Sequence, residues 1–217
     1  MQRSTKELTT SGLLCALAYI LMLVSKLIPE VAGFLQFDLK DIIIVMGGFI
    51  LGPAYALIIS VVVALIEMIT VSNTGIIGLI MNIVSTVAFC CTASLIYSKF
   101  RTFKGAIAGL VFGTMVLTLV MVLWNVYVTP IYMKVPKEVV ISMLSTVFIP
   151  FNVLKGLINS AITLIMYRTV VKSLSKAGLV EYSSSANTKS KSYLSLAIGL
   201  SILAVCIPVF LHLLKII

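Results

Sequence analysis

Seven runs of apolar residues divide this chain, and their lengths constrain its fold more than any other feature. They cover about residues 10–28, 39–51, 53–69, 76–97, 106–128, 151–171 and 193–214. An α-helix needs about 20 apolar residues to cross a bilayer, and most of the runs approach that length. With 60% hydrophobic and only 11% charged residues, the composition excludes an ordinary soluble domain. The sequence predicts an all-α, multi-pass membrane protein.

Breaks between these runs predict the domain organisation. A Gly-Pro pair separates the short second run from the third by a tight turn, and the proline-containing segment 129–150 has an amphipathic middle typical of a short interfacial helix. The segment after the sixth run is polar and rich in serine, which is typical of a flexible linker. We expect a six-helix membrane domain over residues 1–175, a linker over 176–192 and an additional transmembrane helix over 193–217.

The distribution of basic residues predicts the orientation. If the N-terminus is cytoplasmic, ten of the sixteen Lys and Arg residues lie in inside segments, as the positive-inside rule requires. These are Arg3, Lys6, Lys99, Arg101, Lys104, Arg168, Lys172, Lys176, Lys189 and Lys191. The net charge of +9 therefore reports topology, and no aromatic and basic motif accompanies it that would indicate nucleic-acid binding.

A polar stripe interrupts the sixth apolar run. Asn152, Lys155 and Asn159 are spaced by three and four residues, which places them on one face of a helix. A lysine inside a membrane helix costs about 2.5–3.5 kcal/mol, so Lys155 needs a partner, a wet cavity or a nearby membrane surface. The stripe favours a ligand site over a structural network, and snorkelling of Lys155 toward the outer surface is the main alternative.

Other polar and aromatic residues fall at the same predicted outer helix ends, and each has a structural alternative. Asp38 and Asp41 suit a helix N-terminus electrostatically. Glu67 could be an interfacial carboxylate, Asn82 an interhelical hydrogen-bond donor, and Trp124 part of an aromatic belt. The full set of predicted substrate-binding residues is Phe37, Asp38, Glu67, Asn82, Trp124, Asn125, Asn152, Lys155 and Asn159.

Motifs for catalysis or metal binding are absent from the sequence. It contains no GxxxxGK[ST] loop, no HExxH, no GxSxG and only one histidine, His212. The four cysteines have no CxxC spacing and are expected to be small buried residues. We expect no enzymatic activity, no catalytic cofactor and no metal.

Four segments in a fixed order resemble a known family. Gly12 and Ala16 form a small-residue pair in the first helix, followed by FLQFDLKDIIIVMGGFILGPAYA (34–56), SNTGIIGLIMN (72–82) and FNVLKGLIN (151–159). Between residue 12 and about residue 172, the chain resembles the substrate-binding S components of energy-coupling factor (ECF) vitamin transporters, in particular the riboflavin-binding RibU type.

The resemblance implies a function. Such a six-helix bundle captures riboflavin, with FMN as an alternative ligand, from outside the bacterial cell, beneath the loop after helix one. It then works with a membrane scaffold subunit and two cytoplasmic ATPases. The resemblance assigns Gly12 and Ala16 to contact with the scaffold, and Asn152 and Lys155 to the flavin. We expect Asn159 at the deeper flavin edge or supporting Lys155.

Some alternatives stay open at this point. The ribityl hydroxyls of the flavin would suit Asp38, Glu67 or Asn125. Related S components bind thiamin, folate or other vitamins on the same scaffold. A self-sufficient secondary transporter and an intramembrane enzyme are further alternatives, although no clear repeat and no base or nucleophile cluster supports them. The seventh helix departs from the six-helix pattern of the family.

Overall fold

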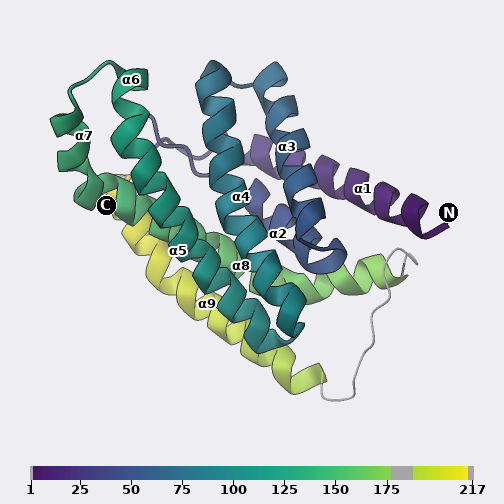
Figure 1. Ribbon diagram of the computed structural model, residues 1–217. Coiled ribbons are helices and arrows are strands. Elements are labelled where there is room, and N and C mark those ends of the chain that lie inside the picture. Colours follow the sequence, from purple (N-terminus) through teal and green to yellow (C-terminus); the bar gives the residue numbers. More distant parts are fainter. Residues whose placement is uncertain (1, 177–187, 215–217) are drawn as a thin grey trace.

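The computed structural model describes residues 2–176 and 188–214, and the regular elements in these ranges are all helices (Figure 1). They are α1 (Gln2–Ser25), α2 (Lys40–Leu51), α3 (Pro53–Thr70), α4 (Gly75–Phe100), α5 (Phe103–Tyr127), α6 (Thr129–Met133), α7 (Lys137–Met143), the π-helical turn η1 (Leu144–Phe148), α8 (Ile149–Lys176) and α9 (Thr188–Leu213). Most of the predicted linker, over 176–192, lies outside the described residues.

Helix α2 forms the centre of the bundle. Its first ten residues, 40–49, are all buried, and it packs against α1, α3, α4 and α8. A helix that is apolar on all sides is stable only when it is surrounded, which explains the unbroken run of isoleucine, valine and methionine. A side chain at Gly48 would collide with Ser94 and Ala56, so this glycine permits the close approach of α3 and α4.

Six helical segments of the described chain are long and apolar enough to cross a membrane. They are Thr5–Ser25, Pro53–Thr70, Gly75–Phe100, Phe103–Tyr127, Lys137–Met166 and Leu196–Leu213. Helix α2 is not among them, because 12 residues extend only about 18 Å. Large apolar side chains such as Leu119 and Leu123 lie exposed on the outside of the bundle, where lipid would cover them.

The sixth predicted helix begins earlier than its apolar run indicated. Instead of starting at residue 151, the span includes α7, η1 and α8 in one continuous segment. Pro150 does not end this helix, because it lies in the first turn of α8, after a π-helical turn that changes the hydrogen-bond pattern. Part of the segment predicted as interfacial therefore extends the spanning helix.

The additional C-terminal helix, α9, packs along α8 (Figure 1). The two helices approach closely at Gly199, where an added Cβ would lie 2.9 Å from the carbonyl oxygen of Ala161. That α9 crosses the membrane, and that the N-terminus is cytoplasmic, remain predictions.

Candidate binding site

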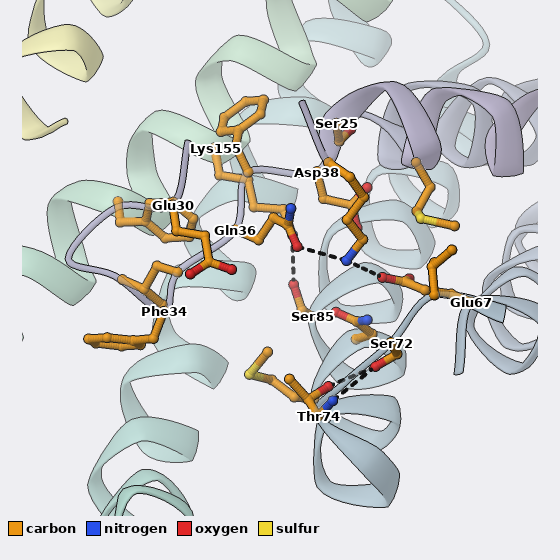
Figure 2. A pocket seen from close by; sticks show the side chains of 18 of the residues that line it. Ser25, Glu30, Phe34, Gln36, Asp38, Glu67, Ser72, Thr74, Ser85 and Lys155 are labelled. Atoms are coloured by element: carbon orange, nitrogen blue, oxygen red, sulfur yellow. Dashed lines mark hydrogen bonds and ion pairs between the residues drawn. The ribbon is translucent and has the colours of Figure 1, made fainter. Parts of the chain in front are cut away.

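A cavity of about 260 Å³ lies where the ends of five helices meet a long loop. The ends of α1 and α3, the starts of α4 and α8, and Met121 of α5 contribute to its wall, together with the loop 26–39. Figure 2 shows the side chains of Lys155, Ser85 and Glu67 gathered around this space. The volume is slightly below the range of about 300–1,000 Å³ that is typical of small-molecule sites.

The loop 26–39 covers the cavity and is fastened at both ends. Ser25 accepts a hydrogen bond from the backbone N–H of Leu39 (2.8 Å), which joins the end of α1 to the start of α2. Within the loop, the backbone groups of Val31 and Leu35 pair with each other across a turn that places Gly33 at φ 79°. This compact loop supplies the residues from Phe34 to Asp38 that line the cavity.

The conformation of the loop is also fixed from below. Asn159 of α8 is 1% exposed, and its Nδ2 donates to the backbone carbonyl oxygen of Asp38 at 3.0 Å. A carbonyl oxygen that is buried away from water needs a hydrogen-bond donor from the protein, and the amide of Asn159 supplies it. Asn159 therefore holds the backbone of Asp38 against α8.

Lys40 is the centre of a buried ion cluster beside the cavity. Its ammonium is fully buried and lies 2.5 Å from Oδ2 of Asp38 and 2.7 Å from Oε2 of Glu67. Lys26, at the rim, pairs with Oε1 of Glu67 at 3.2 Å and donates to Gln36. Burial alone would raise the pKa of Asp38, but the charges of Lys40 and Lys155 outweigh it, so this pKa lies below its usual value.

Lys155 is held more loosely than Lys40. Its Nζ donates to Ser85 at 3.3 Å and lies 3.4 Å from Oδ2 of Asp41, whose other oxygen accepts a shorter bond of 2.8 Å from Thr86. Among the described residues, Oδ2 of Asp41 has no hydrogen bond, so its contact with Lys155 is electrostatic only. An ammonium group has three donors, and Lys155 uses one of them in a long bond. It can therefore donate to a ligand.

Asn152 presents a polar edge next to Lys155. Its Nδ2 donates to the carbonyl oxygen of Phe148 at 2.8 Å, which fixes the amide in place. Phe34 and Phe37 of the loop and Phe151 of α8 contribute apolar surface to the same cavity. The site therefore combines aromatic surfaces with a small group of oriented polar atoms, the arrangement expected for a planar, partly polar ligand.

Six of the nine predicted binding residues line this cavity: Phe37, Asp38, Glu67, Asn82, Asn152 and Lys155. Within the described chain, the other three do not contribute to its wall. Asn125 is buried and bonded to Met121 and Thr129, Trp124 packs against the main core, and Asn159 holds the loop.

Asp38 and Asp41 lie at the N-terminus of α2, where acidic side chains are favourable, but this position is not their whole role. The N-cap position of α2 is Leu39, without a side-chain cap bond. Asp38 accepts from the backbone N–H of Lys40 at 3.1 Å and also pairs with its ammonium, while Asp41 faces Lys155. Both carboxylates are therefore part of the charge network of the site.

Sequence reasoning missed Lys40, Lys26, Ser85 and the aromatic residues Phe34 and Phe151. Lys26 and Lys40 were counted only among the basic residues used to predict the orientation in the membrane. One signal was present: Lys40 lies between Asp38 and Asp41, immediately before the unbroken apolar run that begins at Ile42. A lysine attached to a buried helix requires a carboxylate partner, and Asp38 and Glu67 provide it.

The two residues predicted to contact a scaffold subunit lie on the open face of α1. Gly12 and Ala16 are exposed, and a Cβ added at Gly12 would meet no atom within 4 Å. The neighbouring face of the same helix is buried, with Leu14 and Ala18 in the core. The pair is therefore free to contact another protein.

Comparisons with known proteins identify the family. Residues 6–167 match the family described as "ECF transporter, substrate-specific component". The chain is 28% identical to "Riboflavin transporter RibU" of Staphylococcus aureus over 80% of its length and 95% of the relative. It is 24% identical to "Riboflavin transporter FmnP" of Bacillus subtilis over 72% of its length and 87% of the relative.

A solved structure shares the fold of this chain. It is described as "Structure and mechanism of the S component of a bacterial ECF transporter", and it is 28% identical with a TM-score of 0.67. The match covers 79% of this chain and 98% of the other. The chain therefore belongs to the substrate-specific components of ECF transporters, which are multi-pass proteins of the bacterial cell membrane and not enzymes.

Proposed function

We propose that this S component captures riboflavin from outside the cell in the cavity beneath the loop 26–39. The observation that carries the proposal is the loosely paired Lys155 beside Asn152, in a cavity of about 260 Å³ that aromatic side chains also line. The names of the relatives, riboflavin transporters from Staphylococcus aureus and Bacillus subtilis, support the choice of ligand.

The chemistry of a flavin matches the aromatic and polar residues that line the cavity. Its ring system has two large apolar faces and one polar edge with carbonyl acceptors and a ring N–H. The faces would lie against Phe34, Phe37 or Phe151, while Lys155 donates to an acceptor on the polar edge. Oδ1 of Asn152 would accept from the ring N–H. Asp38, Glu67 and Asn82 then remain for the hydroxyl groups of the ribityl chain.

The ion cluster also favours an uncharged ligand over a phosphorylated one. Glu30, Asp38 and Glu67 line the cavity together with Lys26 and Lys155. The cationic partners of Asp38 and Glu67 are already in place, so a phosphate group would have to compete with existing ion pairs. We therefore expect riboflavin to bind more tightly than FMN.

Transport requires partner subunits. We propose that the loaded S component associates with an ECF module, made of a membrane scaffold subunit and two ATPases, whose ATP hydrolysis drives uptake. The exposed pair Gly12 and Ala16 supports a docking surface on α1. No part of this chain is proposed to hydrolyse ATP.

Purified full-length protein provides the test. A bound flavin would give visible flavin absorbance, and added riboflavin would lose fluorescence on binding. In Lys155→Gln combined with Asp41→Asn, which leaves no unpaired charge, riboflavin affinity should fall at least tenfold. The control Lys104→Gln, at the exposed opposite end, should bind normally. A colourless wild-type protein that does not quench riboflavin fluorescence, and that binds thiamin, folate or no ligand in equilibrium dialysis, would overturn the proposal.

A further inference from the structure

We infer that Phe210 of α9 is a positioning residue for the cavity, which holds Phe37 and the loop 26–39 closed and thereby slows ligand release. The inference rests on the proposed function, because the ligand is taken to be riboflavin. Helix α9 lies outside residues 6–167, the part of the chain that matches the family. The contact between α9 and the loop is therefore an addition to the matched bundle.

Phe37 connects α9 directly to the cavity. It is 2% exposed, lines the cavity, and packs edge-on against Phe210 with ring centroids 5.1 Å apart and an angle of 63° between the ring planes. Edge-to-face aromatic pairs at this distance are attractive beyond their buried area. A movement of Phe37 with the opening loop would therefore disturb its contact with Phe210.

The end of α9 contacts a second part of the same loop. Phe210 and Leu213 pack against the apolar cluster that contains Val31 and Leu35, the two loop residues whose backbones pair. One turn earlier in α9, Cys206 is buried in the cluster that contains Phe37. The final turns of α9 thus support the loop both at its internal turn and at the residue beside the cavity.

The middle of the loop also packs outside α9, because Val31 and Leu35 share a cluster with Val140, Phe148 and Phe151, so α9 is one of its supports. Ala32 and Gly33, at its tip, are exposed and have positive φ angles. Residues 34–38 form one wall of the cavity, and on this inference movement of the loop opens the route for the ligand. Packing by Phe210 stabilises the closed position without touching the ligand. Loss of this packing should therefore raise the dissociation rate more than it changes the association rate.

The opposite face of α9 offers a matched control. Val205 is 67% exposed, and it belongs to neither apolar cluster that contacts the loop. Val205→Ala and Phe210→Ala both shorten an apolar side chain of the same helix, but only the second removes a contact with Phe37. Phe210→Leu keeps an apolar contact and serves as the conservative variant if Phe210→Ala does not fold.

Two measurements on the full chain in detergent test the inference. Stopped-flow fluorescence should show riboflavin dissociation accelerated about three- to tenfold in Phe210→Ala and less in Phe210→Leu, with Val205→Ala unchanged. Hydrogen exchange of the ligand-free proteins should show faster exchange in residues 31–37 in the same order. If riboflavin binds but neither quantity changes in folded Phe210 variants, the inference is wrong. If wild type binds no riboflavin, the proposed ligand fails, while hydrogen exchange still decides the role of Phe210.

Discussion

Lys40 and Glu67 join the first turn of α2 to the last turns of α3 through a buried contact of 2.7 Å between Nζ and Oε2. The lysine side chain is 0% exposed and the glutamate side chain 4%. Removing one partner of a buried ion pair leaves an uncompensated charge, which is far more costly than the net worth of the pair. The two residues therefore tie the central helix to the wall of the cavity.

Lys40→Met should lower the free energy of unfolding by about 3–5 kcal/mol, because Asp38 and Glu67 would lose their shared cation. Lys26→Gln is the control: it removes a cation from the same Glu67, but its side chain is 32% exposed, so the cost should stay within about 1 kcal/mol. Unfolding of the purified proteins in mixed detergent measures both. Equal losses in the two variants would show that burial of Lys40 has no special role.

Asn152 and Asn125 form a second test, because both are 3% exposed and only Asn152 lines the cavity. Asn152→Ala should weaken riboflavin binding about three- to tenfold, as expected for one lost hydrogen bond. Asn125→Ala removes bonds to Met121 and Thr129 and should lower the unfolding temperature with little effect on affinity. Fluorescence titration distinguishes the two. If Asn125→Ala lost as much riboflavin affinity as Asn152→Ala, Asn125 would also be a ligand-binding residue.

The helices could be predicted from the sequence because apolar runs of sufficient length have few alternatives in a membrane. The stripe on α8 was also predictable, since spacings of three and four residues define a helix face. What spacing does not give is the partner across the bundle. Ser85 lies 70 residues from Lys155 in the chain, and Phe210 lies 173 residues from Phe37.

The differences among the predicted binding residues have the same physical origin. Asn125 lies close to the cavity along α5, but its amide faces its own helix and Thr129. Lys40 reads in the sequence as an ordinary loop charge, and only the packing of α2 at the centre buries it. The rotation of α5 about its axis decides which way Asn125 faces, and the central position of α2 decides that Lys40 is buried. Both depend on contacts between segments that are distant in the sequence.

Asn159 offers a third prediction, which separates support of the loop from direct ligand contact. Asn159→Ala should remove the bond of 3.0 Å to the carbonyl oxygen of Asp38 and leave that buried carbonyl without its donor. Riboflavin should then dissociate several-fold faster, and hydrogen exchange around residues 36–40 should increase in the ligand-free protein. If affinity falls while exchange of the loop stays the same, Asn159 contacts the ligand as the sequence pattern indicated.

The exposed pair on α1 yields the last prediction, on coupling to the ECF module. Gly12→Leu and Ala16→Leu add bulk where the isolated chain has open space, so both proteins should fold and bind riboflavin normally. The added side chains would separate α1 from a closely packed scaffold helix, because small residues allow helices in a membrane to approach each other. ATP-driven riboflavin uptake in proteoliposomes with the ECF module should fall at least tenfold. Ala197→Leu, an equal enlargement on the exposed side of α9, should transport normally. Normal uptake by both α1 variants would place the docking surface elsewhere.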